Sequence, residues 1–369
     1  MSQLIIPCHW NKDTLNTIGF LKKKKNKINE IYGVLPNPLI PHGRSPNSVP
    51  KVTPKKAVHF RKIVKEREYK FIYLLNAPFS LNSEKKKKIT EYLEWIVKKF
   101  EADSVMISSL ELMKFVRELY PNLDIYISTI AGVKNVENLK KYLEINPKRV
   151  VVHHDLNRNF KDLDNFIKEC AKENIQVEMM LTESCLRNCP NRKAHYEFLS
   201  KKVKGQLKKG ERFFHTTCNT RKLKYPFELL RANWIRPEDV SYYKDLGLNN
   251  FKITGRSKEA SWLPEVVKAY ANEMYKGNLV RLWGIDPEIN AEDYIYLENK
   301  SLKGFIENFP SGGVKEEKEY TNEWIKKLYY KGNFKLLDGS DYKINSEGIL
   351  ELKTAGSWVS KIIKKEQIK

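Results

Sequence analysis

Two cysteines, Cys185 and Cys189, lie four positions apart in "ESCLRNCPNRKAH" (183–195), directly after the strand-like run "IQVEMML" (175–181). In a helical turn this spacing places both sulfurs on one face, where they could bind a zinc ion or two corners of an iron–sulfur cluster. Cys218 follows in the same polar segment. A single cysteine is more often a small core residue, but three in one polar segment favour metal or cluster binding.

Other cysteine chemistries are less well supported by the sequence. The chain has five cysteines, and this odd number argues against a closed disulfide framework. A radical-SAM loop would need a cysteine three residues after Cys189, where Arg192 stands. A nucleophilic pair of Cys189 with His195 is an open alternative, although the flanks of known thiol proteases are missing.

Short apolar runs that alternate with amphipathic helical patterns indicate the elements that must position these cysteines. Ile-rich and Val-rich strands separated by helices predict βα units and a parallel sheet. About eight such units in about 260 residues fit a TIM-like βα barrel, an α/β fold, better than an open sheet. The predicted strands are 4–7, 29–35, 70–76, 104–108, 124–128, 149–154, 175–181, 234–236 and 251–254.

The rhythm of strands and helices predicts how the chain is organised. Residues 1–285 form the barrel, and residues 182–233 form an excursion after the seventh strand that holds three of the five cysteines. Residues 286–369 form a small Lys-rich C-terminal extension. The segments 85–100 and 164–174 are predicted amphipathic helices, and Cys170 in the second of them is a predicted core residue.

The active site of a βα barrel lies at the carboxyl ends of its strands, so the residues that follow each strand are candidates. Cys8 follows the first strand and is a candidate fourth metal ligand, with packing near the barrel mouth as the alternative. His153 and His154 alternate in direction along their strand, so only one of them can point into the barrel. The predicted catalytic residues are His153, His154 and Glu183, and the predicted substrate-binding residues are Arg44, Asn76, Arg236 and Arg256.

Arginines at the rim suit a carboxylate or phosphate of the substrate. An ordinary salt bridge is an equally good interpretation of Arg44 and of Arg236. The net charge of +22 allows a polyanionic partner such as RNA, but 14 arginines among 67 basic residues leave mostly lysine, which is typical of a solvated surface. No apolar run is long enough to span a membrane or to form a signal peptide, so we expect a cytoplasmic protein.

Several stretches together carry a resemblance to a known family. "QLIIPCHWN" (3–11), "NEIYGVLPN" (29–37), the cysteine pair, and "NNFKITGRSKEASWLPEVVKAYANEMYKGN" (249–278) resemble peptidase family U-32, the collagenase-like proteases. The late signature is a strand ending in Lys-Ile-x-Gly-Arg, followed by a Val-x-Ala-Tyr helix. Here it reads Lys252, Ile253, Gly255 and Arg256, and then Val267, Ala269 and Tyr270.

The resemblance implies a barrel with a four-cysteine iron–sulfur cluster. Several relatives look like oxygen-independent hydroxylases of ubiquinone precursors or RNA bases. Carried over to this chain, the resemblance implies cluster ligands at Cys185, Cys189 and Cys218. The C-terminal region of relatives often contains further cysteines, and this chain has none there.

We therefore expect an iron–sulfur oxidoreductase, such as an oxygen-independent hydroxylase or tailoring enzyme. Its substrate would be an RNA base, a quinone precursor, a peptide or a small metabolite. One alternative is a metal-dependent peptidase or hydrolase with zinc in place of the cluster. Another is a non-catalytic partner of a second barrel protein of the same family. No Ser-His-Asp or His-Glu-x-x-His pattern is readable in the chain.

Overall fold

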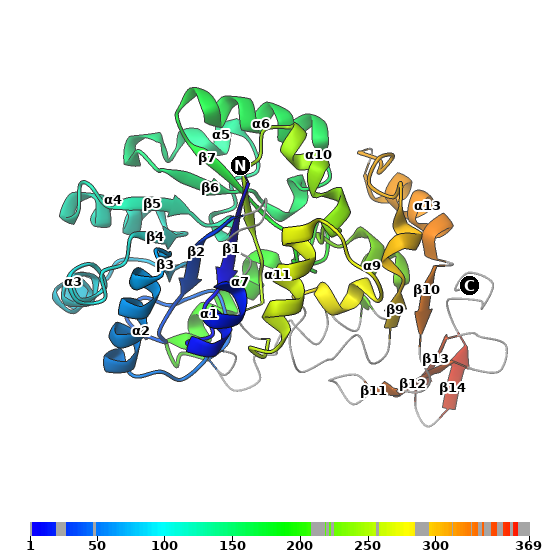
Figure 1. Ribbon diagram of the computed structural model, residues 1–369, viewed down its shortest axis with the longest axis horizontal. Coiled ribbons are helices and arrows are strands. Elements are labelled where there is room, and N and C mark those ends of the chain that lie inside the picture. Colours follow the sequence, from blue (N-terminus) through cyan, green and yellow to red (C-terminus); the bar gives the residue numbers. More distant parts are fainter. Residues whose placement is uncertain are drawn as a thin grey trace.

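Figure 1 shows the protein as a computed structural model. The structure describes residues 2–19, 27–46, 49–207, 218, 221–222, 225–255, 258–284, 295–311, 313–325, 327–330, 334–335, 341–344, 350–354 and 357–360.

Eight parallel strands form a closed barrel in chain order, which confirms the predicted TIM-like α/β fold. Each strand pairs with the next, and β8 closes the barrel by pairing Lys252 with Ile5 of β1. The strands are β1 Gln3–Pro7, β2 Lys27–Gly33, β3 Lys70–Leu75, β4 Ser104–Ile107, β5 Asp124–Ile127, β6 Arg149–Val151, β7 Gln176–Met180 and β8 Asn250–Lys252.

Helices surround the barrel because its strands are apolar on both faces and need cover outside. In β3, for example, every residue after Lys70 is buried. The predicted amphipathic helices are confirmed, since Leu93 of α3 and Phe166 and Cys170 of α6 are buried. The helices around the barrel are α1 Lys12–Gly19, α2 Pro54–Glu66, α3 Lys86–Glu94 with a π-helical turn Trp95–Lys99, α4 Leu110–Leu119, α5 Val136–Lys140, α6 Phe160–Lys172 and α11 Trp262–Asn272.

The strand predicted at 234–236 is wrong. Trp234 and Ile235 are buried, and the Ile235 amide donates a single ladder-like hydrogen bond of 2.8 Å to the carbonyl of Leu181. The chain then turns into the 3-10 helix Pro237–Asp239, because Pro237 has no N–H with which to continue a ladder. An apolar run this short has the same pattern in a strand and in a buried connector.

The barrel interior contains a buried network of charged side chains. Arg149 of β6 forms ion pairs with Glu30 of β2 and with Glu178 of β7, the latter at 3.2 Å. Glu178 also pairs with Lys252 of β8 at 3.2 Å. Because these contacts connect opposite sides of the barrel, they cross its interior. Two carboxylates and two cations balance one another, as buried charges require.

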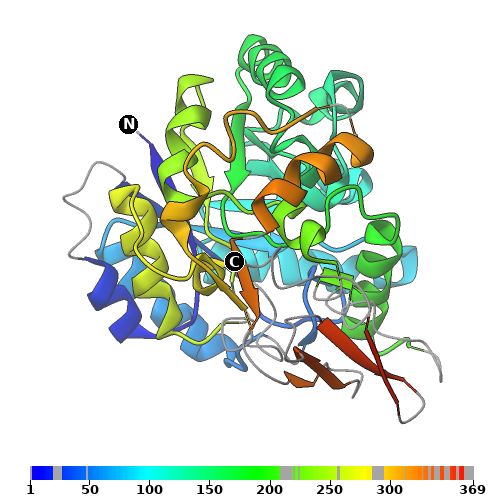
Figure 2. The same cartoon turned by 90° about the vertical axis from the view of Figure 1, so that its right-hand side faces the viewer.

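The excursion after β7 and the segment after α11 pack together beside the barrel. Figure 2 shows α13 lying against this excursion, and α13 contacts α9. The excursion contains α7 Arg192–Val203 and α9 Pro226–Arg231, and α10 Val240–Asp245 follows it before β8. The later part contains β9 Ile295–Leu297, α13 Val314–Ile325, β10 Leu328–Tyr330, and the sheet of β11 Phe334–Lys335, β12 Asp341–Ile344, β13 Leu350–Thr354 and β14 Ser357–Ser360.

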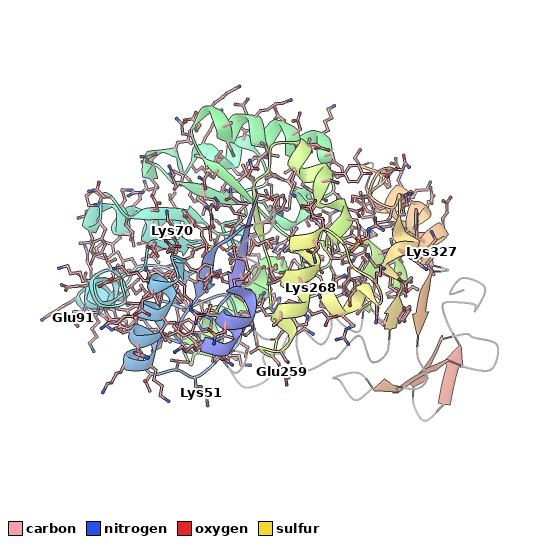
Figure 3. All side chains as sticks on the ribbon, in the orientation of Figure 1. Lys51, Lys70, Glu91, Glu259, Lys268 and Lys327 are labelled. Carbon is pink, nitrogen blue, oxygen red and sulfur yellow. The ribbon has the colours of Figure 1, made fainter. Side chains whose placement is uncertain are left out.

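Charged side chains cover the outside of the molecule. Lys51, Glu91 and Glu259, for example, project from its periphery in Figure 3, and all three are exposed. Among the described residues, no helix combines the length and apolarity that a membrane crossing requires.

Candidate functional site

A cavity opens at the carboxyl ends of the barrel strands, where a βα barrel places its active site. It encloses about 450 Å³ of space, its open mouth included. Side chains such as Leu74, Met106 and Val151 form its apolar wall. The polar groups that matter for chemistry are Arg44, Asn76, His154, Glu183, Tyr196 and Lys252.

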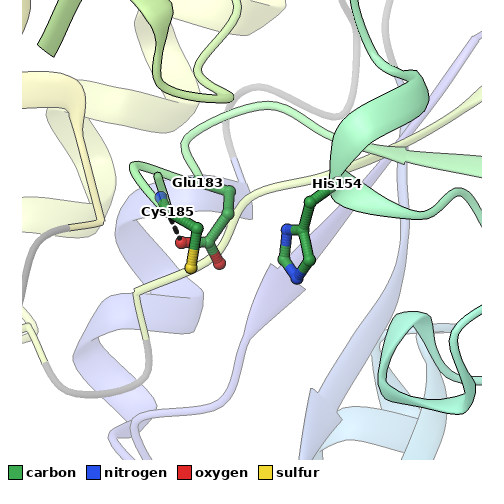
Figure 4. Close-up of side chains that lie close together, drawn as sticks. All are labelled: His154, Glu183 and Cys185. Carbon is green, nitrogen blue, oxygen red and sulfur yellow. Dashed lines mark hydrogen bonds between the residues drawn. The ribbon is translucent and has the colours of Figure 1, made fainter. Parts of the chain in front are cut away.

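Three of the predicted residues converge at one edge of this cavity. The candidate ligand atoms of His154, Glu183 and Cys185 all lie within 4.8 Å of one another. Figure 4 shows the three side chains pointing into a common space, His154 from the end of β6 and the other two from the segment after β7. The Cys185 amide donates a 3.2 Å hydrogen bond to Glu183 Oε1, which holds the carboxylate beside the thiol.

His154 is a buried and neutral histidine. Its Nε2 lies 3.0 Å from the hydroxyl of Tyr196, while its Nδ1 makes no hydrogen bond to any described residue. Burial lowers the pKa of His154 well below its ordinary value, and the positive charges of Arg192, His153 and Arg44 lower it further. A neutral imidazole can bind a metal ion or exchange a proton with a neighbouring group.

Arg44 keeps its positive charge at the cavity wall. Burial by itself lowers the pKa of Arg44, but the nearby Glu183 and other groups that can carry negative charge raise it, and the net shift is upward. Its Nη2 lies 3.9 Å from Glu183 Oε2, a separation that leaves the guanidinium able to reach a ligand. The side chain is 29% exposed, so it faces the open part of the cavity.

The cysteine segment is irregular, which corrects the expected helical turn. Residues 183–186 have no regular structure, and Asn188 adopts a left-handed conformation with a φ of 53° before α7 begins. Asp155 holds the segment in place by accepting hydrogen bonds from the Asn188 amide at 2.9 Å and from Arg192 Nη1 at 2.8 Å. Arg192 also donates to the Leu186 carbonyl at 2.6 Å.

Cys218 influences both Cys185 and Cys189 electrostatically, although among the described residues the one group of three close ligand atoms is that of His154, Glu183 and Cys185. Burial raises the pKa of both Cys185 and Cys189, and the negative charge that Cys218 can carry contributes to both shifts. Cys218 is therefore close enough to act electrostatically on each of the other two. A raised pKa keeps Cys185 and Cys189 in the neutral thiol form until a cation neutralises the thiolates.

The other two cysteines lie in apolar surroundings. Cys8 is 2% exposed, its Sγ accepts a 3.4 Å hydrogen bond from the Trp10 amide, and its Cβ lies beside Gly33. Trp10 in turn packs against Phe71. The described contacts of Cys8 are thus with Trp10 and Gly33, beside an aromatic cluster. The predicted role of Cys8 as the fourth ligand stays a prediction. Cys170 is buried in α6.

The remaining predicted residues are placed differently from one another. Asn76 lies in the cavity wall, where it accepts a 3.3 Å hydrogen bond from the Gly43 amide. His153 caps the turn His154–Leu156 by accepting a 3.2 Å hydrogen bond from the Asp155 amide. Burial lowers the pKa of His153 to about 4. Arg256 lies outside the described residues.

Arg236 is bound to protein groups rather than to the cavity. Its Nη2 pairs with Asp239 at 3.0 Å, and its Nη1 donates to the Asn299 carbonyl at 3.0 Å. Among the described lining residues of the cavity, Arg236 does not occur. Of the two interpretations of this arginine, the structure shows the salt bridge.

Two cavity residues had no predicted role. Tyr196 lies on α7, four residues after Arg192, and no motif in the sequence marks it. Lys252 stands at the end of β8, within the Lys-Ile-x-Gly-Arg signature, and that position could have identified it as a rim residue. Its Nζ lies 4.2 Å from the ring centre of Tyr32 and 3.3 Å from the sulfur of Met106.

Fold and site together define an α/β barrel protein with a cysteine-bearing excursion at the carboxyl rim. The sequence profile of peptidase family U32 matches residues 52–317, and the chain belongs to this family. It is 29% identical over 252 residues to the uncharacterized protease MJ1657 of Methanocaldococcus jannaschii, an alignment that covers 67% of this chain and 73% of that protein.

Two solved structures are similar to this chain at low sequence identity. The U32 peptidase Mk0906 is 12% identical, with a TM-score of 0.48, and the match covers 68% of this chain and 92% of that chain. The citrate synthase SbnG is 7% identical, with a TM-score of 0.32, and the match covers 68% of this chain and 84% of that chain.

Proposed function

We propose that this protein is an iron–sulfur-dependent oxidoreductase, an oxygen-independent hydroxylase or related tailoring enzyme. Cys185, Cys189 and Cys218 would hold the cluster at the rim. The observation that supports the proposal is that Cys185 lies beside His154 and Glu183 of the cavity wall, while the charge that Cys218 can carry acts on both Cys185 and Cys189. The substrate class would be an RNA base, a quinone precursor, a peptide or a small metabolite.

The residues present fit a cysteine-bound cluster. Thiolates are the ligands that iron–sulfur clusters use, and a bound cation would stabilise the thiolates of Cys185 and Cys189, whose pKa burial raises. Cys185, Cys189 and Cys218 would supply three of the ligands, and Cys8, which is buried after β1, stays the predicted fourth. When bound, such a cluster would supply one-electron transfer.

The protein's own side chains would bind and orient the substrate. Arg44 can bind an anionic or carbonyl group at the cavity wall, and the amide of Asn76 can add a hydrogen bond. Glu183 and the neutral His154 can accept or donate a proton beside the substrate. The apolar wall excludes water from the bound substrate, which strengthens these polar contacts.

A second candidate function is hydrolysis with a single bound metal ion. A specific observation favours it, because His154, Glu183 and Cys185 present an imidazole nitrogen, a carboxylate oxygen and a sulfur within 4.8 Å of one another. These are the donor types of catalytic zinc sites, in which the metal activates a water molecule. This candidate shares only Cys185 with the proposed cluster.

Metal analysis of matched variants separates the two functions. The protein would be purified without oxygen and its iron, acid-labile sulfide and zinc measured for wild type and for Cys185→Ser, Cys189→Ser and His154→Ala. Cys170→Ser serves as the control, because Cys170 is buried in α6. An iron–sulfur cluster predicts iron and sulfide that are lost in both rim cysteine variants and kept in His154→Ala and in the control.

The alternative gives a different pattern. A hydrolytic zinc site predicts zinc that is lost in Cys185→Ser and His154→Ala but kept in Cys189→Ser. Iron and sulfide absent from the wild-type protein would overturn the proposed oxidoreductase. If no variant changes the content of any metal, both functions are wrong.

A further inference from the structure

The cysteine segment is tied to a helix far away in the sequence. Arg187, which stands between Cys185 and Cys189, donates from Nε to Glu317 Oε1 at 2.7 Å across 130 positions. Glu317 belongs to α13 and is 1% exposed, while the Arg187 side chain is 5% exposed. This is a buried ion pair, and removing one partner of such a pair leaves the other charge buried and uncompensated.

The Glu317 carboxylate also binds the last part of the excursion, where α9 ends at Arg231. Arg231 of α9 donates from Nε to Glu317 Oε2 at 2.6 Å. Two residues later, the backbone amide and the Nδ2 of Asn233 each donate to the Cys185 carbonyl at 3.3 Å. Glu317 therefore links both sides of the cysteine excursion, one through Arg187 and the other through Arg231.

A third cation, Arg158, is influenced by the charges of both Arg187 and Glu317. Arg158 is fully buried, donates to the carbonyl of Trp234 at 3.0 Å, and lies 4.5 Å from the ring of Trp234. Burial is the main reason why the pKa of Arg158 falls to about 9, the charge of Arg187 contributes to this shift, and Glu317 opposes it. Without Glu317, Arg158 and Arg187 would repel each other in a buried space.

We propose that Glu317 is a positioning residue for the cysteine site, which makes α13 a structural part of that site. Its carboxylate holds Arg187 and Arg231 so that the segment bearing Cys185 and Cys189 keeps its place at the cavity rim. The inference deepens the proposed function, since it concerns the same cysteines. It predicts that the loss of one carboxylate on α13 opens the cysteine segment while the barrel stays folded.

The test compares Glu317→Gln with Glu316→Gln, an exposed neighbour on the same helix. Metal is first removed with a chelator, and the rate of iodoacetamide alkylation of each cysteine is measured by peptide mass spectrometry. Glu317→Gln is expected to speed alkylation of Cys185 and Cys189 by about tenfold or more, because local opening becomes easier. The buried Cys170 reports the stability of the barrel and is expected to keep its wild-type rate, as are all cysteines in Glu316→Gln.

A second variant keeps the proposal testable if Glu317→Gln weakens the whole fold and Cys170 also reacts faster. Arg187→Gln removes the ion pair that joins the cysteine segment to Glu317 and leaves Arg231 with Glu317, so it should speed alkylation of Cys185 and Cys189 alone. Wild-type rates at these two cysteines in Arg187→Gln would overturn the proposal. Because alkylation is measured on metal-free protein, a wild type that binds no metal would refute the proposed function and leave this result standing.

Discussion

Nε2 of His154 lies 3.0 Å from the hydroxyl oxygen of Tyr196, and this hydrogen bond joins the end of β6 to α7. Burial lowers the pKa of His154 and raises the pKa of Tyr196, so both groups are neutral at physiological pH. The helix of the excursion therefore fixes the orientation of His154, the histidine found among the described lining residues of the cavity. Positioned in this way, His154 stands beside Glu183 and Cys185 before any ligand binds.

Removing the Tyr196 hydroxyl should leave this histidine without a partner at Nε2. Tyr196→Phe is expected to lower the free energy of unfolding by about 1–3 kcal/mol, the cost of an unsatisfied buried polar group. Urea unfolding would measure the change. Tyr142→Phe is the control, because the Tyr142 hydroxyl donates only a long 3.4 Å hydrogen bond to the Ala131 carbonyl and its loss should cost about 0.5 kcal/mol. Equal losses in the two variants would contradict the assigned role of Tyr196.

Gly43 should tolerate no side chain, although it stands next to Arg44 in a polar loop. A Cβ at Gly43 would lie 2.4 Å from Ile130 Cδ1 and 3.1 Å from the carbonyl oxygen of Asn76. The isoleucine can rotate, but the carbonyl is backbone and must shift, so Gly43→Ala is expected to cost about 1–3 kcal/mol of unfolding free energy.

Gly19→Ala is the matched control for Gly43→Ala, since a Cβ there meets no atom within 4 Å. It should leave stability within about 0.5 kcal/mol or raise it slightly. Thermal and urea unfolding of both variants would show the contrast. An unchanged stability in Gly43→Ala would mean that the cavity wall relaxes freely around Arg44.

The barrel and the central members of the site were predictable because they follow from local patterns. Runs of Ile and Val separated by amphipathic helices identify βα units, and the carboxyl ends of their strands must meet at one rim. His154, Glu183 and Cys185 each follow a strand directly, so their proximity was predictable from their position in the chain. The strand predicted at 149–154 ends at Val151, so the expected alternation of His153 and His154 does not apply: His153 caps the 3-10 helix His154–Leu156, while His154 lines the large cavity.

The partners of these residues were not predictable in the same way. Tyr196 and Glu317 belong to helices whose docking depends on tertiary packing, and each is one of many similar residues in a chain rich in Tyr and Glu. Arg236 follows an apolar run that resembles a strand, but Pro237 turns the chain and Asp239 binds the guanidinium. For Cys8, the sequence shows that it follows β1 but not which way its side chain points after the strand has ended.

The pair of Arg236 and Asp239 should make stability depend on pH. Burial raises the pKa of Asp239 from its ordinary 3.8 to about 6, although Arg236 opposes the shift. The folded state therefore binds this proton more tightly than the unfolded state does. The resulting stabilisation is fully present below about pH 4 and is lost as the pH rises through about 6.

Asp239→Asn removes this titration and keeps the shape of the side chain. The free energy of unfolding of the wild type, minus that of the variant, should fall by about 1–3 kcal/mol between pH 4 and pH 7. Urea unfolding at intervals across this range would measure it. Asp164→Asn, which removes a partly exposed carboxylate on α6, is the control. The free energy of unfolding of the wild type, minus that of Asp164→Asn, should change by less than about 0.5 kcal/mol between pH 4 and pH 7. If the difference in free energy of unfolding between the wild type and Asp239→Asn does not change with pH, Arg236 keeps Asp239 ionised across the whole range. The attraction of Arg236 for the carboxylate would then outweigh the cost of burying its charge.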